Sequence, residues 1–361
     1  MGIEDRIQSL EEKLQKTPKN KATEKERGRL KSQIAQLKEE KQKKQKGTGD
    51  TSGYAVEKKG DATVALVGFP SVGKSSLLNK LTNAESDVGH YEFTTLDVNP
   101  GMLKHKGANI QILDVPGLIG GAADGRGGGK QVLSVVRNVD LILILLDPEE
   151  MREEEIKKEV YEVGIRMNSS PPDIKVEKTG RGGVKISSTV DLDIGEETLK
   201  DLMHQNGYVN ANVTIREKVD LDSFIDGLMN NRRYIPAVDV VNKEDLIEPD
   251  KKEEYKEKYD LLISAENGTN LDELKDLMFE GLGLIRVYMK EKGDEPDKDE
   301  PLILREGSTV EDALDSLPGD MRERFKKATV TGPSSKFPNQ KVGEEHELMD
   351  EDILELNLRH I

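Results

Sequence analysis

The chain has 361 residues, of which 34% are hydrophobic and 34% are charged, a formal net charge of -16 and no cysteine. This length allows two or three domains. The lack of cysteine excludes disulfides and thiolate metal sites. The acidity argues against nucleic-acid binding by the whole surface, so we expect no DNA partner. The N-terminus lacks an apolar signal core, and the longest strongly apolar run, residues 141–146, is far below the roughly 20 residues of a membrane span, so we expect a cytoplasmic protein without a membrane partner.

Residues 1–50 form a basic N-terminal segment whose apolar residues recur at spacings of three and four on both sides of a break at residues 17–20. This pattern predicts a helical hairpin. The apolar positions are Ile7, Leu10, Leu14, Leu30, Ile34 and Leu37. The excess of Lys and Arg leaves two interpretations open: a solvated hairpin that packs on its own domain, or a contact for RNA or a partner protein. Residues 47–53, rich in Gly, Ser and Thr, predict a linker.

Residues 60–166 alternate apolar strands with helical segments, as in a doubly wound parallel α/β sheet. The candidate strands are Thr63–Val67, Asn109–Asp114 and Leu141–Asp147. Residues 167–230 interrupt this alternation with a double proline, a glycine cluster and β-like alternation, which predicts an inserted α+β subdomain. The strand Ile235–Val241 then resumes the sheet, so the α/β domain comprises residues 60–166 and 231–283.

Residues 284–361 predict a C-terminal domain of short strands and one helix, Val310–Leu317, capped by Ser308 or Thr309. The expected strands include Ile285–Met289 and Ile353–Leu358. Three lysines, Lys326, Lys327 and Lys336, are either RNA contacts or charges that balance nearby acids.

Gly68–Ser75 fits G-x-x-x-x-G-K-[ST] at every fixed position and joins a strand to a helical segment. Such a loop turns its backbone N–H groups toward phosphate oxygens, Lys74 reaches the β- and γ-phosphates, and the Ser75 hydroxyl can ligate Mg²⁺. The N-terminal partial charge of the following helix also favours phosphate. The expected phosphate-binding residues are Gly68, Phe69, Pro70, Ser71, Val72, Gly73, Lys74, Ser75 and Ser76.

Two further segments point to the γ-phosphate and its metal. Asp114 ends a strand and can hold Mg²⁺ through water, while the Gly117 N–H can face the γ-phosphate. The segment 91–96 can fold over that phosphate and give a threonine hydroxyl to Mg²⁺. We choose Thr95, with Thr94 as the next candidate, so the predicted metal ligands are Ser75, Thr95 and Asp114.

An N-K-x-D sequence at the end of a later strand predicts the base. The Asp245 carboxylate can accept from N1–H and the N2 amine of guanine, a donor pair that adenine lacks, while Asn242 and Lys243 brace the loop and cover the base. Ser264, Ala265 and Glu266 follow another apolar run and supply a backbone N–H for the guanine O6. The motifs therefore predict GTP and GDP as ligands, and an ATPase is the weakest alternative.

Taken together, these motifs and the glycine-rich residues 125–129 resemble the Obg-related GTPases, in particular the developmentally regulated GTP-binding protein branch. The resemblance implies a basic helical N-terminus, a GTP-binding domain with a small α/β insertion, and a C-terminal TGS domain of β-grasp type. It further implies a translation-associated GTPase that acts at the ribosome or ribosomal RNA and is stabilised by a dedicated partner protein.

Leu118 occupies the position where Ras-like enzymes carry the glutamine that orients the attacking water. Leucine cannot polarise water, so we predict slow intrinsic hydrolysis, completed by a cation, a partner or the ribosome, with Lys74, Thr95 and Gly117 as the catalytic residues. Related GTPases with an apolar residue here often use K⁺, held partly by a phosphate-loop asparagine, but this chain has Ser71 there, so K⁺ stays an open cofactor. Arg126 could stabilise charge and Asp124 could be a ligand, but we favour the interpretation that this segment is a glycine-rich loop without a catalytic role.

The leading hypothesis is a Mg²⁺-dependent switch that hydrolyses GTP to GDP and phosphate. The alternative is a nucleotide-stabilised scaffold or RNA-binding module in which turnover is not the function. A third hypothesis has the C-terminal domain sense a small ligand and control the GTP-binding domain. The five histidines show no metal-ligand spacing, and only His90 borders a motif.

Overall fold

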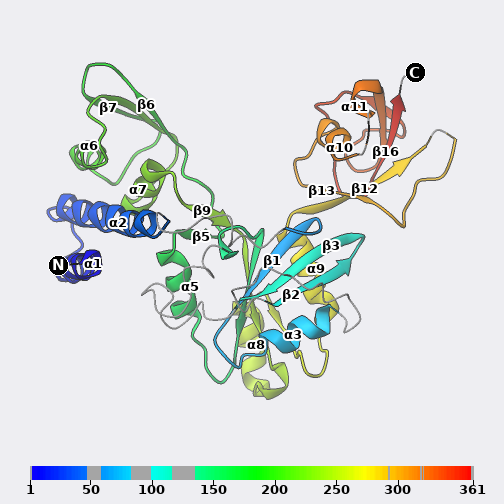
Figure 1. The fold of residues 1–361 in the computed structure, drawn as a ribbon, viewed down its shortest axis with the longest axis horizontal. Coiled ribbons are helices and arrows are strands. Elements are labelled where there is room, and N and C mark those ends of the chain that lie inside the picture. The colour runs from blue at the N-terminus through cyan, green and yellow to red at the C-terminus, as the bar shows by residue number, and fades with distance from the viewer. Residues whose placement is uncertain are drawn as a thin grey trace. The chain divides into compact units, whose positions relative to one another are not determined.

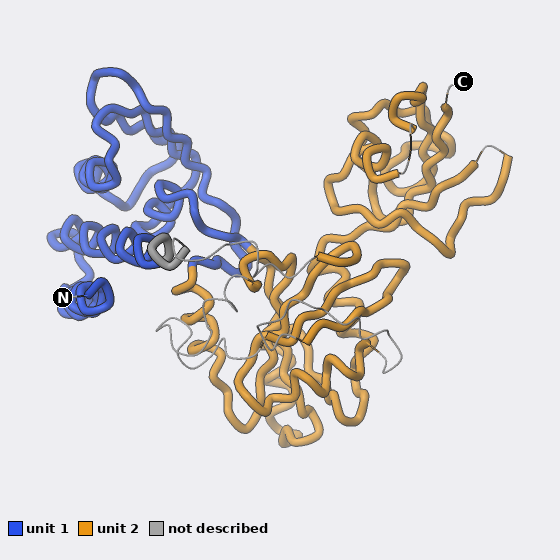
Figure 2. The backbone as a smooth tube through the Cα atoms, in the orientation of Figure 1, with its two compact units in different colours: residues 1–53, 164–234 blue, residues 54–163, 235–361 orange. Residues whose placement is uncertain are grey.

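The computed structural model describes residues 2–46, 58–82, 99–115, 135–291, 293–317, 319 and 321–358, with side chains described except at 42–46. The chain divides into two compact units, residues 1–53 with 164–234 and residues 54–163 with 235–361 (Figure 2). The element labels are those of Figure 1. Within the described ranges every helix is too short or too polar to span a bilayer.

A six-stranded sheet forms the centre of the second unit, in the order β11-β10-β4-β1-β3-β2. Its strands are β1 (Ala62–Val67), β2 (Asn99–His105), β3 (Ala108–Asp114), β4 (Leu141–Leu146), β10 (Ala237–Val241) and β11 (Leu261–Leu262). All neighbouring pairs are parallel except β2 with β3. The predicted strands and the return to the same sheet at β10 are confirmed, whereas the edge strand β2 was not predicted.

Helices cover both faces of this sheet. Leucines of α3 (Lys74–Leu81) and Leu274 and Met278 of α9 (Leu271–Gly281) pack with Val64 and Leu66 of β1 in one apolar cluster. On the other face, Lys157 of α5 (Glu153–Glu162) binds Asp239 of β10 at 2.7 Å. The remaining helical segments here are η2 (Glu244–Leu246) and α8 (Pro249–Lys258). The predicted doubly wound α/β fold is therefore confirmed.

The same unit ends in a five-stranded sheet with the order β13-β12-β16-β14-β15. Its elements are β12 (Leu284–Lys290), β13 (Leu302–Arg305), α10 (Val310–Ser316), α11 (Met321–Arg324), β14 (Phe325–Thr331), β15 (Gln340–Val342) and β16 (Asp352–Leu358). The helix α10 begins where predicted, and Thr309 rather than Ser308 caps it. The Thr309 hydroxyl accepts the Asp312 N–H, and the Asp312 carboxylate accepts the Thr309 N–H in return.

The first unit joins the N-terminal hairpin to the inserted residues. Its elements are α1 (Ile3–Lys16), α2 (Glu24–Lys46), β5 (Ile165–Met167), β6 (Ile174–Lys178), β7 (Val184–Ser188), α6 (Glu196–Gln205), β8 (Ala211–Ile215), α7 (Leu221–Met229) and β9 (Arg233–Ile235). The strands form a β6-β8-β7 sheet and a β5-β9 pair. Figure 1 shows α6 and α7 lying between α2 and the strands β6 and β7.

The predicted hairpin is confirmed: Ile7, Ile34 and Leu37 form its apolar seam. The second helix also packs on the insertion, where the Gln36 amide donates to the Gln205 carbonyl at 2.9 Å and Lys31 pairs with Asp222. Four lysines of α2 are ion-paired, namely Lys25 with Asp201, Lys31 with Asp222, Lys38 with Glu11 and Lys41 with Glu4. In the part of α2 whose side chains are described, most of the positive charge is thus matched within the unit.

Candidate functional site

The phosphate loop follows β1 at the edge of the sheet where the parallel strands end. A Cβ on Gly68 would lie 2.6 Å from the Leu145 carbonyl oxygen, so the loop backbone can approach β4 only with glycine there. Gly73 has φ +97°, and a Cβ there would lie 2.4 Å from the Asn242 side-chain nitrogen. Both glycines of the motif are therefore required by close approach, and the second also by its backbone conformation.

The Lys74 side chain curls back over this loop. Its Nζ donates to the carbonyl oxygens of Gly68 at 2.8 Å and Phe69 at 2.9 Å. Burial lowers the pKa of the Lys74 ammonium, and the nearby Asp114 carboxylate opposes that shift. The structure thus holds a partly desolvated cation at the loop that the motif assigns to phosphate.

Ser75 and Asp114 meet beside that cation. The Ser75 hydroxyl donates to Oδ2 of Asp114 at 2.6 Å. Asp114 is only 5% exposed, and its Oδ1 is buried with no hydrogen-bond partner among the described residues. A hydroxyl and a carboxylate with a spare buried oxygen are oxygen donors of the kind that Mg²⁺ prefers, so these residues fit the predicted metal.

Asn242 connects the phosphate loop to the base-side loops. It is 3% exposed; its amide nitrogen donates to the Val72 carbonyl at 2.9 Å, and its amide oxygen accepts the Ala265 N–H at 2.9 Å. Three segments that are far apart in sequence are therefore held together by one side chain.

Asp245 lies at the surface with one oxygen already oriented. The Ser264 hydroxyl, buried at 1% exposure, donates to Oδ1 of Asp245 at 2.6 Å. The other carboxylate oxygen accepts no hydrogen bond from a described residue. This arrangement holds an exposed acceptor in a fixed direction. Glu266 follows at the surface, as do Pro70 and Ser76 on the phosphate loop.

Two residues that the motif search missed support this site. The carboxylate of Asp147 accepts from the Lys243 ammonium at 2.6 Å, and the Arg152 guanidinium lies 4.6 Å from the Phe69 ring centroid. Asp147 was predicted only as the last residue of a strand, although a carboxylate at the carboxyl end of a central strand is itself a signal. Arg152 has no comparable sequence signal, because its partner depends on the fold.

Several predicted positions lie outside the described residues. These are His90, Thr94, Thr95, Gly117, Leu118, Asp124 and Arg126. Across the ranges that the structure describes, no group of three or more His, Asp or Glu side chains has a geometry that could hold a metal ion.

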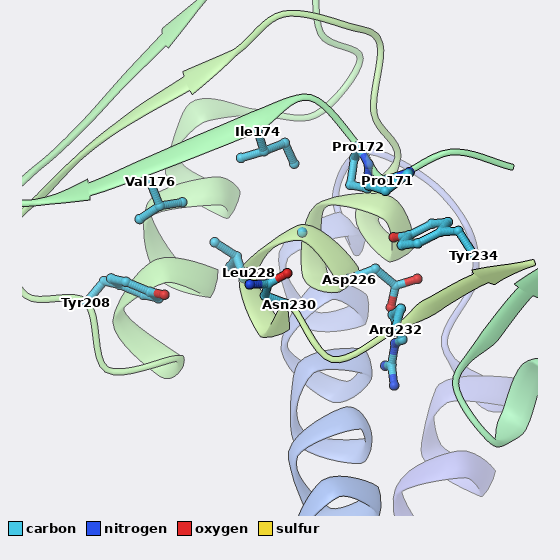
Figure 3. Close-up of a pocket in the computed structure, with 11 residues that line it drawn as sticks. Pro171, Pro172, Ile174, Val176, Tyr208, Asp226, Leu228, Asn230, Arg232 and Tyr234 are labelled. Atoms are coloured by element: carbon cyan, nitrogen blue, oxygen red, sulfur yellow. Dashed lines mark hydrogen bonds and ion pairs between the residues drawn. The ribbon is translucent and has the colours of Figure 1, made fainter. Parts of the chain in front are cut away.

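A pocket in the first unit is unrelated to these motifs (Figure 3). At one end, Asp226 is 6% exposed and binds Arg166 and Arg232, each at 2.6 Å. Its carboxylate is thus occupied by two guanidinium groups and is unsuited to act as a base. Burial raises the pKa of Tyr234, which keeps that hydroxyl neutral. The pocket therefore presents no activated nucleophile.

Comparisons with known proteins agree with the motifs. Residues 63–178 match the family described as a 50S ribosome-binding GTPase, residues 181–284 match the C-terminal region of that domain, and residues 285–357 match the TGS domain. An uncharacterized GTP-binding protein of Halobacterium salinarum is 49% identical over 99% of this chain and 100% of its own length. The human developmentally-regulated GTP-binding protein 2 is 39% identical over 99% of both chains. Among solved structures, the YchF GTPase of Schizosaccharomyces pombe is 14% identical with a TM-score of 0.44, covering 83% of this chain and 99% of that one.

Proposed function

Since this chain belongs to the developmentally regulated GTP-binding proteins, P-loop GTPases with a C-terminal TGS domain, we propose that it is a Mg²⁺-dependent switch. In this proposal it hydrolyses GTP to GDP and phosphate, slowly when alone, and associates with the ribosome. The observation that carries the proposal is the single side chain of Asn242, which ties the phosphate loop at Val72 to the base loop at Ala265.

On the phosphate side, Lys74 supplies the positive charge that the β- and γ-phosphates need. The backbone N–H groups from Gly68 to Ser76 and the N-terminus of α3 surround the same anion. Ser75 and Asp114 would hold Mg²⁺, which when bound neutralises charge between the phosphates. From the sequence, Thr95 would complete that coordination and Gly117 would contact the γ-phosphate.

On the base side, Asp245 accepts from the guanine N1–H and N2 amine. Ser264 holds its carboxylate at 2.6 Å, and Asp147 holds Lys243 at 2.6 Å. The Ala265–Glu266 backbone donates to the guanine O6. A rigid acceptor pair rejects adenine strongly, because the wrong base leaves polar groups unpaired.

The slow rate rests on Leu118, which replaces a water-orienting glutamine. The missing contribution would come from a partner protein, from the ribosome or from K⁺, for which Ser71 replaces the expected asparagine. Single-turnover hydrolysis in K⁺ and in Na⁺ buffers, each with and without purified ribosomes, tests these sources separately. An equal rate in both cations removes K⁺ from the proposal.

Sedimentation with ribosomes tests the switch itself. We expect the protein bound to a GTP analogue to co-sediment more than the GDP form, because the γ-phosphate orders the segments that contact it. Equal co-sedimentation in both forms, together with no ribosome-stimulated hydrolysis, would contradict a switch and favour a nucleotide-stabilised scaffold.

A further inference from the structure

The β6-β8-β7 sheet has one covered face and one open face. Ala211, Val213 and Ile215 of β8 belong to the core cluster that α6 and α7 cover. Because side chains alternate along a strand, the intervening residues point to the opposite face. That open face consists of Lys175, Glu177, Lys185, Ser187, Asn212 and Thr214.

The open face carries hydrogen-bonding and charged groups and no large apolar side chain. The strand register places Asn212 between Glu177 and Lys185, and Thr214 between Lys175 and Ser187. Lys175 and Glu177 pair with each other at 2.7 Å. A protein partner would find little apolar area to bury here, whereas hydroxyls and amides suit phosphates and ribose hydroxyls.

The connection from β6 to β7 adds a cluster of cations, which we call the cationic loop, residues 178–185. Lys178, Arg181 and Lys185 are exposed, and none of them forms an ion pair with a described residue. This distinguishes them from the four paired lysines of α2. In a chain of net charge -16, cations without an ionic partner among the described residues are available to an external anion.

The cationic loop is held in place by hydrogen bonds to Asn210, which directly precedes β8. The Thr179 N–H donates to the Asn210 carbonyl at 3.1 Å, and the Gly183 N–H donates to the Asn210 side-chain oxygen at 2.8 Å. Lys178 pairs with Ala211 and therefore starts from the covered side at the end of the sheet, where its ammonium lies 5.3 Å from the Tyr208 ring centroid, whereas Lys185 points to the open face. The cations are therefore presented by a folded turn, which lowers the ordering cost of binding.

We propose that the open face and the cationic loop bind the sugar-phosphate backbone of RNA. The cations neutralise phosphates, and Ser187, Asn212 and Thr214 hydrogen-bond to phosphate or ribose oxygens. This inference rests on the proposed association with the ribosome and assigns it a surface in the inserted residues. Two other sets of exposed lysines are rival surfaces. Lys13, Lys16 and Lys21 lie at the hairpin turn, which acidic Glu11 and Glu12 adjoin, and Lys326, Lys327 and Lys336 are the lysines of the TGS domain for which the sequence left RNA contact as one interpretation.

The test compares two triple variants of the full chain, each lacking three cations. One is Lys178→Ala/Arg181→Ala/Lys185→Ala, and the matched control is Lys13→Ala/Lys16→Ala/Lys21→Ala. Binding of a labelled mixed-sequence RNA duplex is followed by fluorescence anisotropy over a KCl series, with a DNA duplex of the same sequence as a second probe. GDP affinity and far-UV circular dichroism report whether each variant is folded.

We expect the loop variant to lower RNA affinity at least about tenfold and to flatten the plot of log affinity against log salt by about two, one each for the phosphate contacts of Arg181 and Lys185, because Lys178 starts from the covered side of the sheet. The control should change both little, and the DNA duplex should bind more weakly than RNA. An unchanged loop variant, or an equal loss in the control, overturns the inference while leaving RNA association intact. If the unmodified chain binds ribosomes but not RNA, the face binds no RNA. If it binds neither, the proposed ribosome association fails as well. Should the triple variant misfold, the single charge reversal Arg181→Glu provides the same comparison.

Discussion

In the proposed site, the carboxylate of Asp245 is the group that we expect to select the base. Replacing it in Asp245→Asn exchanges an acceptor for a donor, which matches the extra carbonyl of xanthine in place of the N2 amine of guanine. Losing a charged hydrogen-bonded pair costs about 3 kcal/mol, so we expect GDP affinity to fall roughly a hundredfold and XDP to become the preferred ligand. Competition of unlabelled GDP, XDP and ADP against a fluorescent nucleotide measures the ranking. An unchanged preference for GDP would show that Asp245 does not pair with the base.

Ser264 contributes to the same recognition by orientation. In Ser264→Ala the Asp245 carboxylate loses the donor at 2.6 Å, a neutral-to-charged hydrogen bond worth about 1 to 2 kcal/mol. We expect GDP affinity to fall roughly five- to thirtyfold while the ranking of bases is preserved. The neighbouring exposed Asn267 offers a control, because only its backbone N–H contacts Ser264, so Asn267→Ala should leave the affinity unchanged.

Lys74 makes nucleotide affinity depend on pH in a defined direction. Burial lowers its pKa below 10.5, so the ammonium of the nucleotide-free protein is lost at a lower pH than that of a lysine in water. Affinity for GDP should therefore be constant below the lowered pKa and fall as the pH rises through it. Titration of GDP affinity from neutral to alkaline pH measures this.

Lys74→Arg is the matched variant for that titration. Arginine stays charged over the whole range, so the part of the alkaline loss that comes from Lys74 should be absent in Lys74→Arg, whereas deprotonation of the guanine N1–H at high pH should weaken both proteins alike. Parallel profiles in the two proteins would assign the alkaline loss to another group.

The residues of the site differ in how far sequence could predict them. Lys74, Ser75, Asp114 and Asn242 were predicted because phosphate and base chemistry fix their types at set distances from strand ends. Asp147 and Arg152 were not predicted as site residues, because their contacts with Lys243 and Phe69 exist only in the folded chain.

At the scale of elements, the apolar runs of β1 and β4 predicted buried central strands, and both are buried at every position. The edge strand β2 contains Pro100 and Gly101 and buries only one of its seven residues, so it lacks the pattern that a search for strands relies on. The docking of α2 on α6 and α7 was also beyond prediction, because it depends on how two distant amphipathic helices match.

Gly28 shows how close that docking is. It lies inside α2, and a Cβ there would lie 3.3 Å from Leu221 Cδ2 and 3.6 Å from Leu202 Cδ2. We expect Gly28→Val to overpack this contact and lower the free energy of unfolding of the first unit by about 1 to 3 kcal/mol. Urea denaturation combined with hydrogen exchange of α6 amides measures the loss, and GDP affinity should not change.

Gly28→Ala and Arg29→Ala complete that series. Alanine gains about 1 kcal/mol of helix propensity over glycine but meets the tight Leu221 contact, so we expect a small net effect. Arg29 is exposed on the same helix, and its replacement should be neutral. A Gly28→Val protein as stable as the unmodified chain would mean that α2 does not dock on α6 and α7 in solution.

At the scale of the whole molecule, local patterns could not reveal which segments pack together. In the sequence, more than a hundred residues lie between the hairpin and the insertion, yet residues 1–53 and 164–234 form one compact unit. Periodicity reports the face that an element buries, and it does not report the partner that covers that face. For the same reason, the contact between the GTP-binding domain and the TGS sheet could not be predicted from the sequence.

That contact centres on Asp140, which directly precedes β4 and is partly buried, with a side-chain exposure of 16%. Its carboxylate accepts the Thr63 N–H at 2.9 Å and binds Arg305 of β13 at 3.0 Å. Ile303 of the same strand packs against the core of the GTP-binding domain. The GTP-binding domain and the TGS sheet are therefore joined by an ion pair and an apolar contact.

We expect Arg305→Ala to cost less than about 1 kcal/mol, because this arginine is half exposed and solvent screens its charge. Asp140→Ala should cost about 1 to 3 kcal/mol more, because it also leaves the Thr63 N–H buried and unpaired.

In the unmodified protein, GDP should slow hydrogen exchange of β12 and β13 amides, since a ligand stabilises whatever unfolds together with its site. In Asp140→Ala that protection should shrink while protection of β1 and α3 persists. The control is Arg322→Ala, because the partners of Arg322, Glu311 and Asp315, lie within the TGS domain. In this control, GDP should protect the β12 and β13 amides as fully as in the unmodified protein. Equally full protection in Asp140→Ala would show that Asp140 does not couple the two domains.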